Sequence, residues 1–232
     1  MDLQCRDIKR QLSERFCLGP LTHRFVQGST TAILGHNGAG KSTFFRLVSG
    51  LDEACGGEML WGNERIHQKN HHYKRSIGYL AQPLEMPLWV SGGDLLSYVS
   101  ALKKNTDKAD LASLMDLFGV TEYQHKALAS CSYGMRKRVA LVMSLLGDPG
   151  LLILDEPLSG LDITHIGSLR HILQKRKQRG QCTLLSTHIL SFACEEACHV
   201  LLMNSGTWQE VKGWGSWDRK QQEDTLKTFF DS

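Results

Sequence analysis

Short apolar runs alternate along the chain with longer segments in which apolar residues recur every three or four positions. Apolar runs of four or five residues predict buried strands, and they lie at residues 31–34, 77–80, 151–154, 182–186 and 200–203. Helical spacing and polar faces predict helices at residues 42–49, 163–178 and 190–197. Because continuous apolar strands separated by helices are typical of a parallel sheet with both faces covered, we expect an α/β core.

Two regions depart from this alternation. Residues 1–34 read as short strands around a turn at Gly19-Pro20, and residues 59–61 add another strand, which predicts an N-terminal antiparallel β subdomain. From residue 93 to 147 apolar positions keep helical spacing, which predicts an inserted helical subdomain. We therefore expect one domain of 232 residues, in which residues 1–92 and 148–232 form the α/β core.

Composition and charge argue against several classes of protein. The chain is 41% hydrophobic and 22% charged, as in ordinary globular proteins, and its net charge of +3 is too mild to favour a nucleic-acid binder. No run approaches the 18 or so apolar residues of a membrane span, and the N-terminus lacks the apolar core of a signal peptide. Seven scattered cysteines, an odd number, predict reduced thiols of a cytosolic protein.

Two clusters of potential metal ligands are weaker candidates. Cys194 and Cys198 lie four positions apart on a predicted helix, and His67, His71 and His72 lie in a polar stretch that reads as a loop. Zinc sites built from cysteine and histidine combine two such pairs, and no second pair at matching spacing follows. We interpret the thiols as packing groups and the histidines as loop residues.

The strongest chemical signal is the pattern G-x-x-x-x-G-K-[ST] at residues 35–43, between a predicted strand and a predicted helix. Glycines let the backbone wrap closely, so that successive N–H groups point at phosphate oxygens, and the helix dipole adds to anion binding. Lys41 supplies positive charge to the β- and γ-phosphates, and the Ser42 hydroxyl is placed to ligate Mg²⁺. The nucleotide-binding candidates are Gly35, Asn37, Gly38, Ala39, Gly40, Lys41, Ser42 and Thr43.

A second signal is the pair of carboxylates that follows the apolar run 151–154. In an open α/β sheet, ligands bind at the carboxyl ends of the strands. Asp155 is then placed to hold Mg²⁺, and Glu156 to orient or deprotonate an attacking water. An exposed acidic turn before Pro157 is the alternative, and the phosphate-binding loop upstream makes it the weaker interpretation.

With these motifs the chain resembles the ATP-binding subunits of ABC transporters, over roughly residues 16–208. Residues 158–162 look like the family's D-loop, His188 like its switch histidine, and Gln82 like its Q-loop glutamine. The family's signature, usually Leu-Ser-Gly-Gly-Gln, matches residues 131–135. Ser132 and Gly134 are kept there, whereas Tyr133 and Met135 depart from the commonest form.

The resemblance implies a mechanism. It implies a head-to-tail dimer with a second ABC ATPase subunit, identical or different, in which Ser132 and Gly134 of one copy contact the γ-phosphate bound by the other. It implies Gln82 and Asp155 as Mg²⁺ contacts, and Glu156 and His188 as catalytic groups beside Lys41. An aromatic residue usually stacks on adenine in this family, and Phe16 is the candidate, with a core phenylalanine as the alternative.

The resemblance also implies a partner in the membrane. The chain is expected to act at the inner face of the cell membrane, bound to a separate permease that selects the substrate. The apolar stretch 84–89 either docks that permease or caps the helical subdomain. The Ser-x-Gly-Met form of the signature resembles exporters. The alternative function is a soluble, non-transport ABC ATPase that acts as a cofactor-assembly factor.

Overall fold

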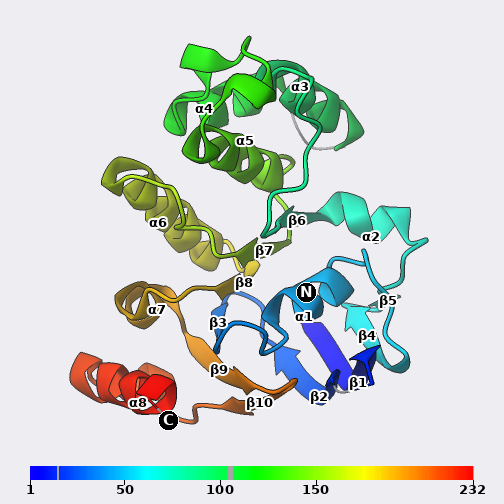
Figure 1. Ribbon diagram of the computed structural model, residues 1–232, viewed down its shortest axis with the longest axis vertical. Helices are drawn as coiled ribbons and strands as arrows, with labels where there is room; N and C mark the ends of the chain where they lie inside the picture. The colour runs from blue at the N-terminus through cyan, green and yellow to red at the C-terminus, as the bar shows by residue number, and fades with distance from the viewer. Residues whose placement is uncertain (15, 104–106, 232) are drawn as a thin grey trace.

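The five predicted buried strands, together with an edge strand that was not predicted, form one six-stranded sheet at the centre of the molecule (Figure 1). The computed structural model describes residues 1–14, 16–103 and 107–231. The strand order is β10-β9-β3-β8-β7-β6, in which β9 and β10 pair antiparallel and the other neighbours pair parallel. The strands are β3 (Thr30–Leu34), β6 (Ile77–Leu80), β7 (Leu151–Asp155), β8 (Cys182–Ser186), β9 (His199–Asn204) and β10 (Thr207–Glu210).

A second, antiparallel sheet of order β2-β1-β4-β5 is built from the N-terminal part of the chain. Its strands are β1 (Leu3–Ser13), β2 (Phe16–Phe25), β4 (Gly56–Trp61) and β5 (Glu64–Arg65). The expected turn at Gly19-Pro20 is wrong, because both residues lie inside β2. Gly19 has φ +99°, and a Cβ there would lie 2.0 Å from the carbonyl oxygen of Ile8. The glycine serves a close approach of two long strands, not a turn between short ones.

Helices cover both faces of the six-stranded sheet. They are α1 (Lys41–Val48), α2 (His71–Ser76), α3 (Gly92–Leu102), α4 (Lys108–Leu117), α5 (Tyr133–Leu145), α6 (Ile163–Gln178), α7 (Leu190–Glu196) and α8 (Arg219–Asp231). Short 3₁₀ turns lie at Thr121–Tyr123, Leu128–Ser130 and Trp214–Ser216. Helices α3, α4 and α5 follow β6 and precede β7 in the chain, and Figure 1 shows them grouped at one end of the molecule.

The helix α2 occupies a stretch whose first residues read as a loop in the sequence. The side chain of Asn70 accepts a hydrogen bond from the backbone N–H of Tyr73 at 2.9 Å and so caps the helix. Tyr73 is fully buried. The prediction failed for His71 and His72 because one cap and one buried ring hold a helix whose other residues are polar.

Alternate residues of the central strands face two different cores. Ile33 and Ile153 pack with α1 in the core between the two sheets. Leu152 and Leu154 pack on the opposite face with α5, α6 and α7. Burial on both faces explains why these strands read as continuous apolar runs, and the predicted α/β fold class with its N-terminal antiparallel sheet is confirmed.

The C-terminal helix α8 lies beside α7 (Figure 1). Trp214 is buried, and its indole N–H donates to the carbonyl oxygen of Ala197 at 3.1 Å. The ring of Phe230, at the end of α8, lies 5.3 Å from the ring of His36. Each of the seven cysteines carries a free thiol, and no helix within the described ranges is long and apolar enough to cross a membrane.

Candidate nucleotide-binding site

The loop between β3 and α1 is shaped by close backbone contacts. A Cβ at Gly35 would lie 2.1 Å from the carbonyl oxygen of Met203, so no larger residue fits without displacing β9. Gly38 and Gly40 have φ of +81° and +113°, values that favour glycine. Behind the loop, the carbonyl oxygen of Ala39 accepts a hydrogen bond from Gly206 N–H at 2.9 Å. The loop is therefore held in one form by its neighbours.

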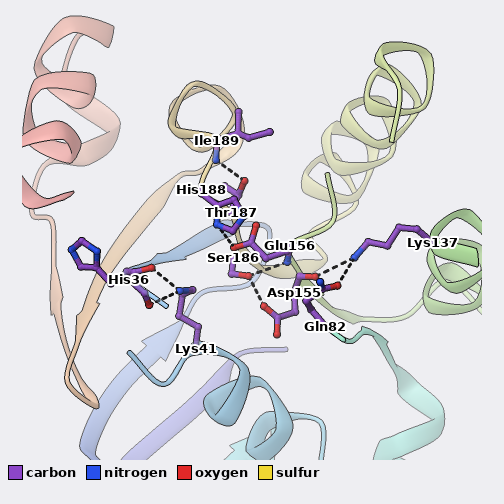
Figure 2. A network of polar contacts seen from close by, with 11 residues as sticks. His36, Lys41, Gln82, Lys137, Asp155, Glu156, Ser186, Thr187, His188 and Ile189 are labelled. Atoms are coloured by element: carbon purple, nitrogen blue, oxygen red, sulfur yellow. Dashed lines mark hydrogen bonds and ion pairs between the residues drawn. The ribbon is translucent and has the colours of Figure 1, made fainter. Parts of the chain in front are cut away.

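Lys41 curls back over this loop at the first position of α1 (Figure 2). Its ammonium donates to the carbonyl oxygens of Gly35 and His36, at 2.6 and 3.0 Å. Burial lowers the pKa of Lys41, while the nearby carboxylates of Glu156 and Asp155 act in the opposite direction. The loop thus presents a positive charge at its concave side, where a phosphate would bind.

Asp155, the last residue of β7, lies directly opposite Ser186, the last residue of β8. The Ser186 hydroxyl donates to Oδ1 of Asp155 at 2.6 Å and accepts from the backbone N–H of Glu156 at 3.0 Å (Figure 2). Asp155 and Ser186 are both buried. One hydroxyl group therefore fixes the orientation of two successive acidic residues.

Glu156 follows β7 with φ +51°, an uncommon value for a residue other than glycine. Oε1 of its carboxylate lies 3.0 Å from Nδ1 of His188, which follows β8. Burial raises the pKa of Glu156, while His188 and Lys41 oppose the shift. The backbone turn at Glu156 places a carboxylate of raised proton affinity beside an imidazole at the mouth of the site.

A cleft of about 560 Å³ joins these groups. The sequence-predicted residues that line it are Phe16, Asn37, Gly38, Gly40, Lys41, Ser42, Thr43, Gln82, Asp155, Glu156 and His188. Leu12 and Ser159 line it too; Ser159 belongs to the predicted D-loop, whereas sequence reasoning did not include Leu12. Phe16 and Leu12 are the apolar members of a lining that is otherwise polar, charged or glycine. The cleft therefore offers a hydrophobic contact together with a charged catalytic region.

The predicted residues Gly35, Ala39, Ser132 and Gly134 do not line the described cleft. Gly35 and Ala39 support the loop from behind. Ser132 is exposed, and its hydroxyl accepts from the backbone N–H of Met135 at 3.2 Å, which caps α5. Gly134 packs against the turn after β7, where its Cβ would lie 2.7 Å from the carbonyl oxygen of Gly160. Within one chain, the signature residues lie apart from the phosphate loop's cleft.

Gln82 connects the cleft to the signature helix. It lines the cleft, yet its side-chain carbonyl oxygen accepts a hydrogen bond from the Tyr133 hydroxyl at 2.9 Å. The ammonium of Lys137 lies 3.4 Å from the same oxygen and 3.5 Å from the backbone carbonyl oxygen of Asp155 (Figure 2). The oxygen predicted to contact Mg²⁺ is therefore engaged by α5.

Sequence reasoning missed the roles of Ser186 and Lys137 in this network. The contact of Ser186 depends on the register of β7 against β8, which no local pattern reports. Lys137 gave no distinguishing signal either, because it lies between Arg136 and Arg138 on α5 and only the fold shows that it is the buried one of the three.

The residues present fit a bound Mg²⁺. The Oδ2 atom of Asp155 is buried and has no hydrogen-bond partner among the described residues. The Ser42 hydroxyl and the Gln82 amide line the same cleft. Carboxylate, hydroxyl and amide oxygens are the hard ligands that Mg²⁺ prefers.

Comparison with known protein sequences places the chain in a family. A family profile described as "ABC transporter" matches residues 18–159. The ABC transporter ATP-binding protein YhcH of Bacillus subtilis is 30% identical over 190 residues, covering 82% of this chain and 62% of YhcH. The lantibiotic transport ATP-binding protein SrtF of Streptococcus pyogenes is 29% identical, covering 82% of this chain and 81% of SrtF. The aliphatic sulfonates import ATP-binding protein SsuB of Pseudomonas entomophila is 33% identical, covering 88% and 73%.

Solved structures share the fold. An ATP-binding subunit of an ABC transporter superposes with a TM-score of 0.85 at 24% identity, covering 98% of this chain and all of the other. The cassette MJ0796, solved as a dimer, superposes with a TM-score of 0.80 at 16% identity, covering 91% of this chain and 99% of the cassette. The strand–loop–helix site, the matching profile and these relatives agree, and the chain belongs to the ABC transporter family as an ATP-binding cassette.

Proposed function

We propose that this chain is the ATP-hydrolysing subunit of an ABC transporter. The observation that carries the proposal is the convergence of Lys41, Asp155, Glu156 and His188 on one cleft behind a phosphate-shaped loop. These are the groups that phosphoryl transfer needs, because its catalysis rests on positioning and on stabilising charge that develops on the phosphate oxygens.

The proposed steps use the contacts described above. ATP places its phosphates on the loop's N–H groups, and the Lys41 ammonium exchanges its carbonyl partners for phosphate oxygens. Phe16 supports the adenine ring by stacking. Mg²⁺ held by Ser42, Asp155 and Gln82 would neutralise charge on the β- and γ-phosphates. Glu156 accepts a proton from the attacking water, and its raised pKa suits that role. His188 contacts the γ-phosphate beside it.

We further propose that the active form is a dimer with a second cassette, identical or different. Ser132 and Gly134 lie outside this chain's own cleft, which supports a role for them at the site of another copy. The exposed N-terminus of α5, with Ser132 at its cap, is suited to an anion. The dimeric structure of the MJ0796 cassette supports such an arrangement.

Replacing Glu156 with Gln tests the hydrolytic proposal. We expect Glu156→Gln to bind ATP with wild-type affinity and to lose at least about 100-fold in turnover, since the amide cannot accept the proton. Glu122→Gln, the same exchange at an exposed position, serves as the matched control and should keep full turnover. Wild-type turnover in Glu156→Gln would overturn the assignment.

We propose a separate membrane-spanning permease as the partner, with the chain held at the inner face of the cell membrane. The end of the apolar segment 84–89 supports this, because Trp89 is 82% exposed and Leu88 43% exposed, whereas Leu84 and Met86 pack against the core. Purification from native membranes tests the idea. A polytopic protein bound to the cassette supports it, and a cassette recovered without membrane protein points to a non-transport ATPase.

The direction of transport is the most detailed part of the proposal. The Ser-x-Gly-Met signature favours an exporter, whereas the relatives are named for lantibiotic transport in one case and for sulfonate import in another. ATP-driven uptake or release by vesicles that contain the purified complex distinguishes the two directions. The permease determines which substrate is carried.

A further inference from the structure

The side-chain carbonyl oxygen of Gln82 has two competing partners, a hydrogen-bond donor on α5 and the proposed Mg²⁺. The Tyr133 hydroxyl donates to this oxygen at 2.9 Å, across 51 positions of sequence. In the proposed function the same oxygen contacts Mg²⁺. Tyr133 stands where the family's commonest signature has glycine, so this hydrogen bond depends on a residue in which the chain departs from that pattern.

Lys137 reinforces the contact from the next turn of α5. It is fully buried, and its ammonium lies 3.4 Å from the Gln82 oxygen and 3.5 Å from the Asp155 carbonyl oxygen. Tyr133 and Lys137 are four residues apart and share one helix face. The helix therefore aims two donors at a single acceptor.

The Tyr133 ring also lies against an exposed turn of the chain. Its Cδ1 and Cε1 atoms lie 3.0 and 3.1 Å from the position of a Cβ at Gly160, in the turn after β7. Gly160 has φ +78°, and Gly134 packs against its carbonyl oxygen. The phenol thus bridges the Q-loop and the turn that follows the two carboxylates.

We propose that Tyr133 and Lys137 are positioning residues that hold the Gln82 carbonyl oxygen on α5, so that a nucleotide-bound cation must displace them to reach it. The inference rests on the proposed function. It gives a role to Tyr133, the residue that departs from the commonest signature. The hydrogen bond of Tyr133 stabilises the nucleotide-free arrangement and weakens cation binding. Release of the bond breaks the direct link between the N-terminal turn of α5 and Gln82, which lines the cleft.

Tyr133→Phe tests the competition directly. The variant keeps the ring against Gly160 and removes only the hydroxyl. Because a hydrogen bond of this kind contributes about 0.5–1.5 kcal/mol, the affinity for Mg²⁺ of the ADP-bound protein should rise about two- to tenfold. Calorimetric titration of Mg²⁺ into protein saturated with ADP measures it, and ADP keeps hydrolysis out of the readout.

The matched control is Tyr98→Phe, which removes a hydroxyl from an exposed tyrosine on α3 and should leave Mg²⁺ affinity unchanged. The same titration in a Gln82→Ala background completes a double-mutant cycle. There, Tyr133→Phe should have no effect, because the contested oxygen is gone.

Three outcomes are distinguishable. A gain in Tyr133→Phe that vanishes with Gln82→Ala supports the competition. An unchanged or weaker affinity in Tyr133→Phe, or a gain that persists without Gln82, overturns it while the proposed function stands. Failure of the wild-type protein to bind ADP, with or without Mg²⁺, overturns the proposed function itself.

Discussion

The carboxyl edge of the six-stranded sheet and the N-terminal turn of α5 both carry residues of the proposed nucleotide site, but they hold them differently. At the sheet edge, Asp155 and Ser186 are buried, adjacent in register and hydrogen-bonded to each other. At α5, Ser132 and Tyr133 are exposed, and the Tyr133 hydroxyl donates to the half-buried side chain of Gln82.

The difference separates fixed groups from exchangeable ones. Residues on strand ends keep their positions because backbone pairing and burial set them, as catalysis by preorganised groups requires. Residues at the exposed helix terminus can change partners for the cost of a hydrogen bond or two. If this contrast is right, substitutions at the sheet edge should damage stability and binding together, whereas substitutions at the helix should separate them.

The largest expected effect is that of Gly35→Ala. Its Cβ would lie 2.1 Å from the Met203 carbonyl oxygen, so β9 or the loop must move. We expect a loss of about 3 kcal/mol in unfolding free energy, together with loss of ADP binding, measured by urea denaturation and calorimetry. Gly167→Ala is the control, because no atom lies within 4 Å of its added Cβ. If Gly35→Ala is as stable as the control, the claim that backbone contacts fix the sheet edge is contradicted.

Ser186→Ala should have the next largest effect. It leaves Oδ1 of Asp155 and the N–H of Glu156 without their partner inside the protein. We expect a loss of about 2 kcal/mol in stability and a fall in ATP turnover, since the Asp155 carboxylate and the backbone of Glu156 both lose a hydrogen bond that orients them. Ser113→Ala, at an exposed position on α4, should change neither quantity. Full turnover in Ser186→Ala would contradict the role of the Ser186 hydroxyl in orienting Asp155 and Glu156.

Ser132→Ala should separate stability from catalysis. It removes the cap of α5, which costs about 1 kcal/mol, and it removes a hydroxyl proposed to act on a second copy's nucleotide. ADP affinity should stay at the wild-type value while turnover falls. Asp107→Ala removes the comparable cap of α4, so it should cost similar stability and keep turnover. Equal turnover in the two variants would contradict the role given to Ser132.

Trp89→Ala should have the smallest effect on the chain by itself. Trp89 is 82% exposed, so unfolding free energy should change by less than about 0.5 kcal/mol, with ADP binding unchanged. Co-purification with the membrane partner should nevertheless be reduced. A marked loss of stability would show that Trp89 helps to hold the helical subdomain together, and would contradict its role in docking.

Sequence reasoning found the parts of the site whose neighbours are close in the chain. The loop at 35–43 and the carboxylates after residue 154 are recognisable because strand, loop and helix follow one another. It failed for Gly19, whose role depends on Ile8 in a neighbouring strand. It also missed the link between Gln82 and Tyr133, since periodicity reports which face is buried and not which distant side chain meets it.

The hydrogen bond from Ser186 to Asp155 has a consequence for the cation that the proposed site would bind. The Ser186 hydroxyl occupies Oδ1 of Asp155 and leaves Oδ2 without a partner. A carboxylate in that state coordinates through a single oxygen. Calcium sites commonly use carboxylates in a bidentate manner and gather six to eight ligands, whereas the smaller Mg²⁺ needs few protein ligands and keeps water. If Asp155 holds the proposed cation, the pairing of two strands would leave it one oxygen for that ion, which would favour the smaller Mg²⁺ over Ca²⁺.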